Sequence, residues 1–144
     1  MFTTRLANSK DYDFLFELKK AAEYEPIKAI FGWDETLQKK IHQQEWNENK
    51  PIMIEVEGSP VGSYLVEKHA DHLYFGRFFL LPSFQGKGIG SAILESVFEL
   101  ACEESLPIKL CYLQGNRVGR LYSRLGFEIT KQDSQFVYMC KVCC

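Results

Sequence analysis

The segment from Gln85 to Gly90 contains residue types that can hold a phosphate group. It reads Gln-Gly-Lys-Gly-Ile-Gly, follows the apolar run 78–82 and precedes a helix-like run at 91–102. Glycines allow positive φ and close approach of a ligand to the backbone. The free N–H groups at a helix start, with the helix dipole behind them, favour an anion. The segment therefore predicts an anion site; a turn that only permits tight packing is the alternative.

The segment from Asn116 to Phe127 carries a second motif. It contains the Asn at its start, Gly119, Leu-Tyr at 121–122 and Leu-Gly-Phe at its end. The first motif is not a P-loop, because no Lys-Ser/Thr follows, and its glycines do not fit the dinucleotide pattern G-x-G-x-x-G. Both motifs together resemble the acetyl-CoA loop, Q-x-x-G-x-G, and the late segment of the GNAT superfamily of N-acetyltransferases.

The order of expected elements agrees with that resemblance. Apolar periodicity and turn residues predict a β-α-α-β-β-β-α-β-α-β-β chain, a mixed sheet of the α/β (α+β) class, in one GNAT-like domain over residues 1–144. We expect Asp11 and Asp34 to cap the first two helices, and Pro26 to end the first helix or limit its continuation. The apolar side of the second helix is expected to include Leu37, Ile41 and Trp46. The expected strands are 3–7, 51–57, 61–67, 73–81, 107–113, 127–130 and 135–140, and the expected helices are 12–24, one from 34 onward, 91–102 and 116–125.

Composition excludes several classes of function. The net charge of −2 and pI near 5.9 argue against a nucleic-acid binder. No apolar run approaches the roughly 20 residues of a membrane span, and the N-terminus has no signal-peptide pattern, so a cytoplasmic location is expected. The five cysteines are an odd number crowded toward the C-terminus. They form a poor disulfide framework and lack the second ligand pair of a zinc site, so we expect no metal.

The resemblance implies acetyl-CoA as cosubstrate. It also implies a splay between the strands ending at Leu81 and near Leu113, with the pantetheine arm pairing there with backbone and the pyrophosphate lying over the glycine loop. Asn116 has an alternative as a helix N-cap, and Arg124 has one as part of a solvated face. The implied cofactor-binding residues are Phe79, Leu80, Leu81, Gln85, Gly86, Lys87, Gly88, Ile89, Gly90, Ser91, Asn116 and Arg124.

Tyr122 is the catalytic candidate. The resemblance implies that its phenol protonates the departing CoA thiolate as a general acid. The backbone N–H of Leu80 is the expected donor to the oxyanion that forms when an amine attacks the thioester. The alternative is a packed aromatic whose hydroxyl only orients the cofactor.

The general base is left open by the sequence. Many family members carry a glutamate on the strand before the loop, but 74–81 contains no carboxylate, and Arg77 lies near the expected place. A water chain to another side chain, or an acceptor amine of low pKa, would serve instead. The candidates for such a chain are Glu67, His69, His72 and the segment 33–35.

The acceptor surface is expected around Phe31, Trp33, Asp34 and Glu35, where aromatic faces and carboxylates could hold a cation. These aromatics as core anchors, with Asp34 as an N-cap, are the alternative. The expected acceptor is a small-molecule or peptide amine. We expect a monomer, or a homodimer paired through the edge strand at 135–140. A non-catalytic acyl-CoA sensor and an interaction protein remain competing functions.

Overall fold

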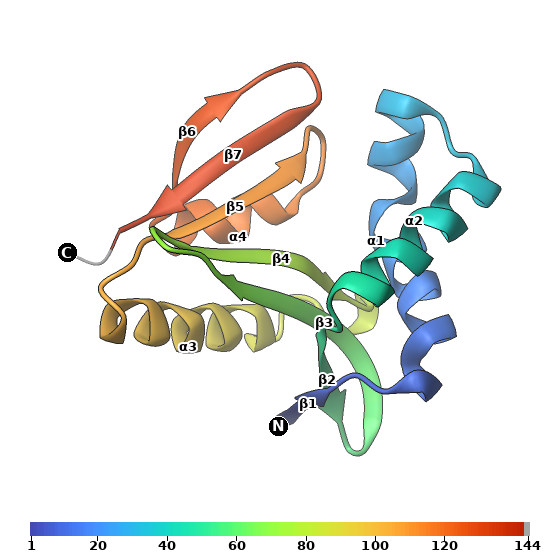
Figure 1. Cartoon of the computed structure of the whole chain (residues 1–144), viewed down its shortest axis with the longest axis horizontal. Coiled ribbons are helices and arrows are strands. Elements are labelled where there is room, and N and C mark those ends of the chain that lie inside the picture. The colour runs from blue at the N-terminus through green and yellow to red at the C-terminus, as the bar shows by residue number, and fades with distance from the viewer. Residues whose placement is uncertain (143–144) are drawn as a thin grey trace. The chain divides into compact units, whose positions relative to one another are not determined.

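The computed structural model describes residues 1–142, so the cysteines at 143 and 144 lie outside the described residues. Seven strands and four α-helices follow the predicted order (Figure 1). The strands are β1 (Phe2–Leu6), β2 (Ile52–Val56), β3 (Ser59–Lys68), β4 (Leu73–Leu80), β5 (Ile108–Leu113), β6 (Glu128–Gln132) and β7 (Phe136–Lys141). The helices are α1 (Tyr12–Phe31), α2 (Glu35–Glu48), α3 (Ile89–Glu103) and α4 (Val118–Arg124). The sheet order is β1-β2-β3-β4-β5-β7-β6, which confirms the predicted mixed α/β class.

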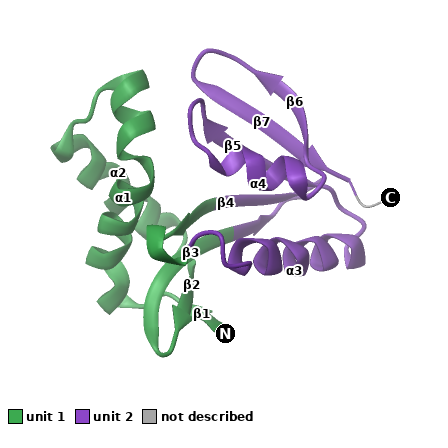
Figure 2. Ribbon diagram, turned by 180° about the vertical axis from the view of Figure 1, so that it is seen from behind, with its two compact units in different colours: residues 1–65, 77–84 green, residues 66–76, 85–144 purple. Residues whose placement is uncertain are grey.

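The chain divides into two compact units, coloured separately in Figure 2. The first comprises residues 1–65 and 77–84, and the second residues 66–76 and those from 85 onward. Strands β3 and β4 each contribute to both. The prediction of one domain over the whole chain stays a prediction.

The first unit is built on three antiparallel strands and two helices. β1 pairs with β2 and β2 with β3. The β2–β3 turn has positive φ at Glu57 (50°) and Gly58 (79°), the signature of a type I′ hairpin. Its small core forms where α1 packs on the sheet. That core contains Ala7, Leu15, Leu18 and Met53, with Phe14, Trp46, Phe79 and Leu81 packed against it.

Helix α1 runs through Pro26, so the prediction that this proline ends the helix is wrong. Proline removes one helical hydrogen bond, but Ile27 directly after it is 5% exposed. Burial of that side chain offsets the lost bond. The helix ends instead at Gly32, whose φ of 79° breaks the helical path while its N–H still donates to the Lys28 carbonyl.

The buried side of helix α2 differs in part from the predicted one, since Trp46 packs against the core as predicted but Leu37 does not. The Asp34 carboxylate accepts from the Leu37 N–H at 3.1 Å, which confirms the cap. Leu37 itself is 49% exposed, whereas Gln38 and His42 are each 8% exposed. The His42 ring contacts the Tyr12 ring at 4.5 Å between centroids, and its Nε2 bonds the Tyr12 carbonyl. An aromatic contact and a backbone acceptor thus bury a polar side chain that the predicted apolar side did not include.

Asp11 stabilises the start of α1 without the predicted side-chain cap. Its carboxylate accepts two bonds from Arg5, at 2.7 and 2.9 Å, and one from the Asn8 N–H at 2.8 Å. The side chain is 5% exposed. The Arg5 hydrogen bonds, and then the backbone bond from Asn8, hold the pKa of the Asp11 carboxyl below its usual value.

Asp11→Asn is expected to lower the free energy of unfolding by roughly 2–3 kcal/mol at pH 7, because it leaves the Arg5 guanidinium without its buried partner. The folded pKa of Asp11 lies below the unfolded one. The stabilisation is therefore complete above the unfolded pKa of about 4 and disappears as pH falls through the folded pKa. Urea unfolding at pH 7 and pH 3 checks this: the gap between wild type and variant should narrow at pH 3. The exposed Asp13→Asn is the control, and an equal loss for both variants would contradict the prediction.

The second unit positions the two sequence motifs. β4 and β5 pair in parallel at Leu73–Ile108 and Tyr74–Lys109, and β5 pairs with β7 along six residues. Helix α3 buries one apolar stripe, as its periodicity predicts. Pairing of β4 with β5 at only two positions is compatible with the predicted splay between these strands. The splay itself stays a prediction. The buried residues of α3 are Ile89, Gly90, Ile93, Leu94, Val97 and Ala101.

Candidate functional site

The glycine loop opens α3 in left-handed backbone. Gly86 and Gly88 have φ of 73° and 85°, a region that L side chains rarely adopt, and Gly88 is the N-cap of the helix. A Cβ built at either glycine meets nothing within 4 Å. Residues 85–88 are exposed, and Ile89 beyond them is buried. The glycines are therefore not needed for tight packing; they shape a bare backbone turn open to a ligand.

The first turn of α3 offers unpaired donors at that loop. The first intrahelical bond runs from the Ala92 N–H to the Gly88 carbonyl at 3.0 Å. The amides of the three residues before Ala92 therefore lack an intrahelical acceptor. Arg124 of α4 brings a cation to the same turn, since its Nη2 lies 3.5 Å from the Ser91 hydroxyl oxygen. Backbone donors, the helix dipole and a guanidinium together suit a phosphate group.

Tyr122 is held by the way α4 ends. Gly126, with φ of 97°, follows the helix, and the N–H groups of Gly126 and Phe127 donate to the carbonyls of Ser123 and Tyr122. This is a Schellman motif, which brings the residue after the glycine against the last helical turn. The Phe127 and Tyr122 rings accordingly lie 5.7 Å apart. The Leu-Tyr-x-x-Leu-Gly-Phe pattern thus fixes the tyrosine through backbone hydrogen bonds.

The Tyr122 side chain is 5% exposed and lies among aromatic rings. The Phe75 ring meets it edge-on, at 85° and 6.4 Å between centroids, and the Tyr112 ring lies tilted at 5.8 Å. Burial raises the pKa of the neighbouring Tyr112 phenol. The Tyr112 hydroxyl also occupies the place that a Cβ on Gly119 would take. Gly119 is therefore required by this neighbour.

Asn116 acts at the start of α4. Its side-chain oxygen accepts from the Val118 N–H at 3.0 Å. The helix begins at Val118 with Arg117 as its N-cap, so the interpretation of Asn116 as the N-cap is wrong. Its backbone N–H donates to the Leu113 carbonyl. The predicted contact with pantetheine stays a prediction.

The three residues predicted to contact pantetheine through their backbone, Phe79, Leu80 and Leu81, lie at the end of β4. This part of the chain belongs to the first unit. The Leu81 N–H donates to the Val61 carbonyl of β3 at 2.8 Å, so it is already engaged. Successive residues of a strand direct their N–H groups to opposite edges. The Leu80 N–H is therefore directed away from β3. Gly62 permits this close pairing, since a Cβ there would lie 2.5 Å from the Phe79 carbonyl oxygen.

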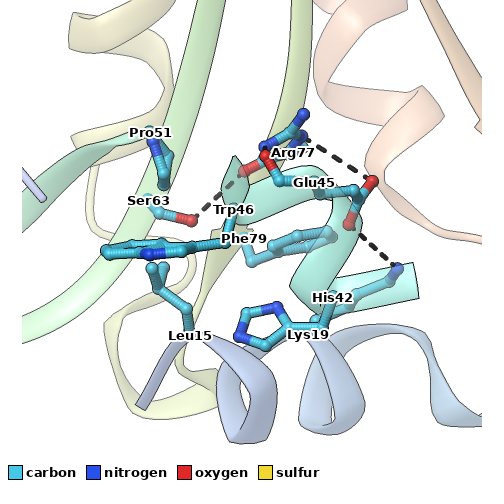
Figure 3. A pocket seen from close by; sticks show the side chains of 9 residues that line it. All are labelled: Leu15, Lys19, His42, Glu45, Trp46, Pro51, Ser63, Arg77 and Phe79. Atoms are coloured by element: carbon cyan, nitrogen blue, oxygen red, sulfur yellow. Dashed lines mark hydrogen bonds and ion pairs between the residues drawn. The ribbon is translucent and has the colours of Figure 1, made fainter. Parts of the chain in front are cut away.

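A pocket opens over β4 in the first unit (Figure 3). Arg77 has φ of 47° within the strand, and the buried Ser63 hydroxyl donates to its carbonyl at 3.2 Å. The Glu45 carboxylate lies 3.7 Å from Arg77 Nε and 3.5 Å from Lys19 Nζ. The pocket is lined by Leu15, Lys19, His42, Glu45, Trp46, Pro51, Ser63, Arg77 and Phe79.

Comparison with known proteins decides the family. The family model described as an acetyltransferase (GNAT) domain matches residues 48–129, more than half of the chain. The chain belongs to the GNAT acetyltransferase family. This confirms the resemblance stated from the two motifs and supports the predicted enzyme class, an acetyl-CoA-dependent N-acetyltransferase.

Individual relatives agree with the family. An uncharacterised N-acetyltransferase of Methanocaldococcus jannaschii is 27% identical over 88% of this chain, which spans 61% of that protein. The crystal structure of the PaiA N-acetyltransferase of Thermoplasma acidophilum with coenzyme A is 16% identical, covers 99% of both chains and has a TM-score of 0.77. A GNAT acetyltransferase of Brucella melitensis with acetyl-CoA is 15% identical, covers 99% of this chain and 88% of its own, and has a TM-score of 0.64. These structures confirm the fold.

The predicted acceptor segment of this GNAT chain already holds a cation of its own. Glu35 accepts from Trp33 Nε1 at 2.8 Å and from Lys20 Nζ at 3.0 Å, and these bonds lower its pKa. Lys20 also lies 5.7 Å from the Trp33 ring centroid. Phe31 is 54% exposed. The segment therefore has the predicted chemistry, but Lys20 occupies the position that an acceptor ammonium would take.

The predicted base candidates of the second unit contact one another. His69 lies 3.8 Å from a Glu67 oxygen and stacks on His72 at 4.6 Å between centroids. His72 Nδ1 lies 2.7 Å from an Asp71 oxygen, and that hydrogen bond lowers the pKa of Asp71. The four residues form one polar cluster at the turn between β3 and β4.

Sequence reasoning missed Lys19 and Glu45 in this GNAT chain. Both come from helices, and Glu45 approaches Arg77, the residue at the place where the family glutamate was expected. The only available signal was the missing carboxylate on β4. That absence indicated that a carboxylate near this place would have to come from another element, but not that α2 supplies it.

No helix within residues 1–142 is long and apolar enough to cross a membrane.

Proposed function

We propose that this chain transfers an acetyl group from acetyl-CoA to a primary amine by direct attack of the amine. The observation that carries the proposal is the exposed left-handed glycine loop at the start of α3, with Arg124 at the same turn. Family membership supports the same reaction. The chain spans about three-fifths of the curated relative that it matches, so the acceptor and the assembly state are proposals as well.

The described residues fit the cosubstrate. The loop amides from Gln85 to Ser91 would hold the pyrophosphate, with Lys87 and Arg124 adding positive charge. Backbone groups of Phe79 to Leu81 and the side chain of Asn116 would contact the pantetheine arm. The Leu81 N–H is already engaged with the Val61 carbonyl. Acetyl-CoA supplies the acetyl group as a thioester.

The chain contributes two groups to the chemistry. The Leu80 N–H donates to the oxyanion that develops as the amine attacks the acetyl carbon. Tyr122 gives its phenolic proton to the departing thiolate, and the bond between the acetyl carbon and sulfur breaks as the amide forms. The amine reacts in its neutral form and loses its second proton to solvent or to a polar side chain.

Ligand-dependent stability tests the cosubstrate. The melting temperature is measured with and without acetyl-CoA, and with S-acetylpantetheine, which lacks the pyrophosphate. At a hundred times its Kd a ligand stabilises the native state by about 2.7 kcal/mol. We expect a clear rise with acetyl-CoA and a smaller one with S-acetylpantetheine. No rise with acetyl-CoA would overturn the proposal and favour an interaction protein.

A non-catalytic acyl-CoA sensor is the second candidate, favoured by the absence of a carboxylate from residues 73–80 of β4. It predicts the same stabilisation with no transfer to any amine.

A further inference from the structure

Two positively charged side chains and one negatively charged side chain line the pocket over β4, and both positive ones are largely buried. The Lys19 and Arg77 side chains are 16% and 21% exposed, and they share the Glu45 carboxylate. Both distances to that carboxylate, 3.5 and 3.7 Å, are longer than a good N–H···O hydrogen bond. Two largely buried cations thus have one loosely held counter-ion between them, as Figure 3 shows.

The other nearby carboxyl does not restore the balance. Burial raises the pKa of Glu23, the repulsion of Glu45 adds to this, and Lys19 opposes it. Its negative charge is therefore disfavoured relative to an exposed glutamate. The Lys19 ammonium has three N–H donors. Within residues 1–142 it has the Glu45 ion pair and no hydrogen bond to a protein acceptor.

Arg77 is fixed in position and keeps donors for a ligand. Its Nη1 donates to the backbone carbonyls of Glu45 at 3.2 Å and Asn49 at 2.9 Å. Ser63 holds its carbonyl oxygen, and its φ of 47° departs from the strand. Its Nη2 makes no hydrogen bond in the described part of the chain. A rigid guanidinium with an open nitrogen beside an ammonium is suited to a carboxylate.

The size of the pocket limits what it accepts. Its cavity volume is about 30 Å³, and apolar walls come from Leu15, Trp46 and Phe79. A space of this size admits a group of a few atoms, such as a carboxylate, and not a ring. Arg77 lies three residues before Leu80, about 10 Å along a strand. A group bound at Arg77 is therefore separated from the proposed oxyanion donor by a spacer of several bonds.

We propose that Lys19 and Arg77 bind a carboxylate of the acceptor, so that the acceptor is a small amine that also carries a carboxylate group. The inference rests on the proposed acetyl transfer and names its acceptor class. Glu45 holds the two cations in position and offsets part of their charge when the acceptor is absent.

The test compares acids with their amides. Amine-dependent release of CoA is measured for β-alanine, 4-aminobutyrate and 6-aminohexanoate, each beside its carboxamide, which keeps the amine and loses the charge. Wild type is expected to favour at least one acid over its amide about tenfold or more in kcat/KM, since a charged hydrogen bond contributes roughly 1.5–3 kcal/mol. Lys19→Met keeps the apolar stem and should reduce this ratio about tenfold. Lys19→Arg should restore most of it.

Lys40→Met is the matched control, because it removes the same charge from an exposed position on α2. Its ratio should equal that of wild type. Binding of the N-acetylated acids and of their amides, followed by NMR of the protein, provides a readout without turnover. Transfer by wild type with no preference for any acid, or a preference unchanged in Lys19→Met, overturns the carboxylate subsite. Absence of transfer to every amine would refute the proposed function instead. In that case, acid-selective binding that Lys19→Met abolishes would still support the carboxylate subsite. Absence of acid-selective binding would overturn the subsite.

Discussion

Tyr122→Phe is expected to lower kcat about 100-fold or more, the usual contribution of a general acid, while the Kd for acetyl-CoA changes less than about threefold. The variant removes one oxygen from a side chain that is 5% exposed and keeps the ring that packs on Phe127. The loss therefore falls on the transition state, where the thiolate departs, and not on binding. Steady-state release of CoA and calorimetric titration with acetyl-CoA measure the two quantities.

Tyr64→Phe provides the control for losing a buried hydroxyl. Tyr64 lies on β3, in the first unit, and is 8% exposed. Its variant is expected to keep kcat within about threefold of wild type, because no catalytic step is assigned to it. If Tyr122→Phe also kept the wild-type kcat, the general-acid role would be wrong and Tyr122 would be a packed aromatic.

Gly88→Ala is expected to weaken acetyl-CoA binding about tenfold or more. The residue has φ of 85°, so an alanine strains the backbone by about 1–2 kcal/mol. Its Cβ would project into the open space over the loop, where the pyrophosphate is proposed to lie. Both effects move or cover the amides of the first α3 turn. Titration calorimetry measures the affinity, and urea unfolding measures the stability.

Gly58→Ala separates backbone strain from ligand contact. Gly58 has φ of 79° and, like Gly88, nothing within 4 Å of a built Cβ, but it lies in the β2–β3 turn of the first unit. The two variants should lose similar stability, while only Gly88→Ala loses affinity. Equal affinities in the two variants would mean that the glycine loop does not hold the cosubstrate.

The features that follow from short-range sequence were predictable. The glycine loop requires left-handed backbone at Gly86 and Gly88, and their lack of a side chain signals it directly. Gly126 closes α4 through hydrogen bonds within five residues, so the late motif predicted its helix end. The strand and helix order followed from periodicities of the same range.

The pocket could not be predicted in the same way, because its charges meet only in three dimensions. Lys19, Glu45 and Arg77 come from two helices and a strand, and none is unusual in its local sequence. The burial of His42 on α2 was missed because it depends on a tertiary contact to Tyr12. Helix α1 continues through Pro26 for a related reason, because burial of Ile27 after the proline outweighs the local helix-breaking effect of Pro26.

Amine-dependent release of CoA tests the central claim most directly. The reduced protein is incubated with acetyl-CoA and a broad panel of primary amines, free thiol is followed with time, and the product is identified by mass. The account predicts release that requires both protein and amine, with one acetyl group added to the amine for each thiol formed. Stabilisation by acetyl-CoA without amine-dependent release for any member of the panel would contradict it.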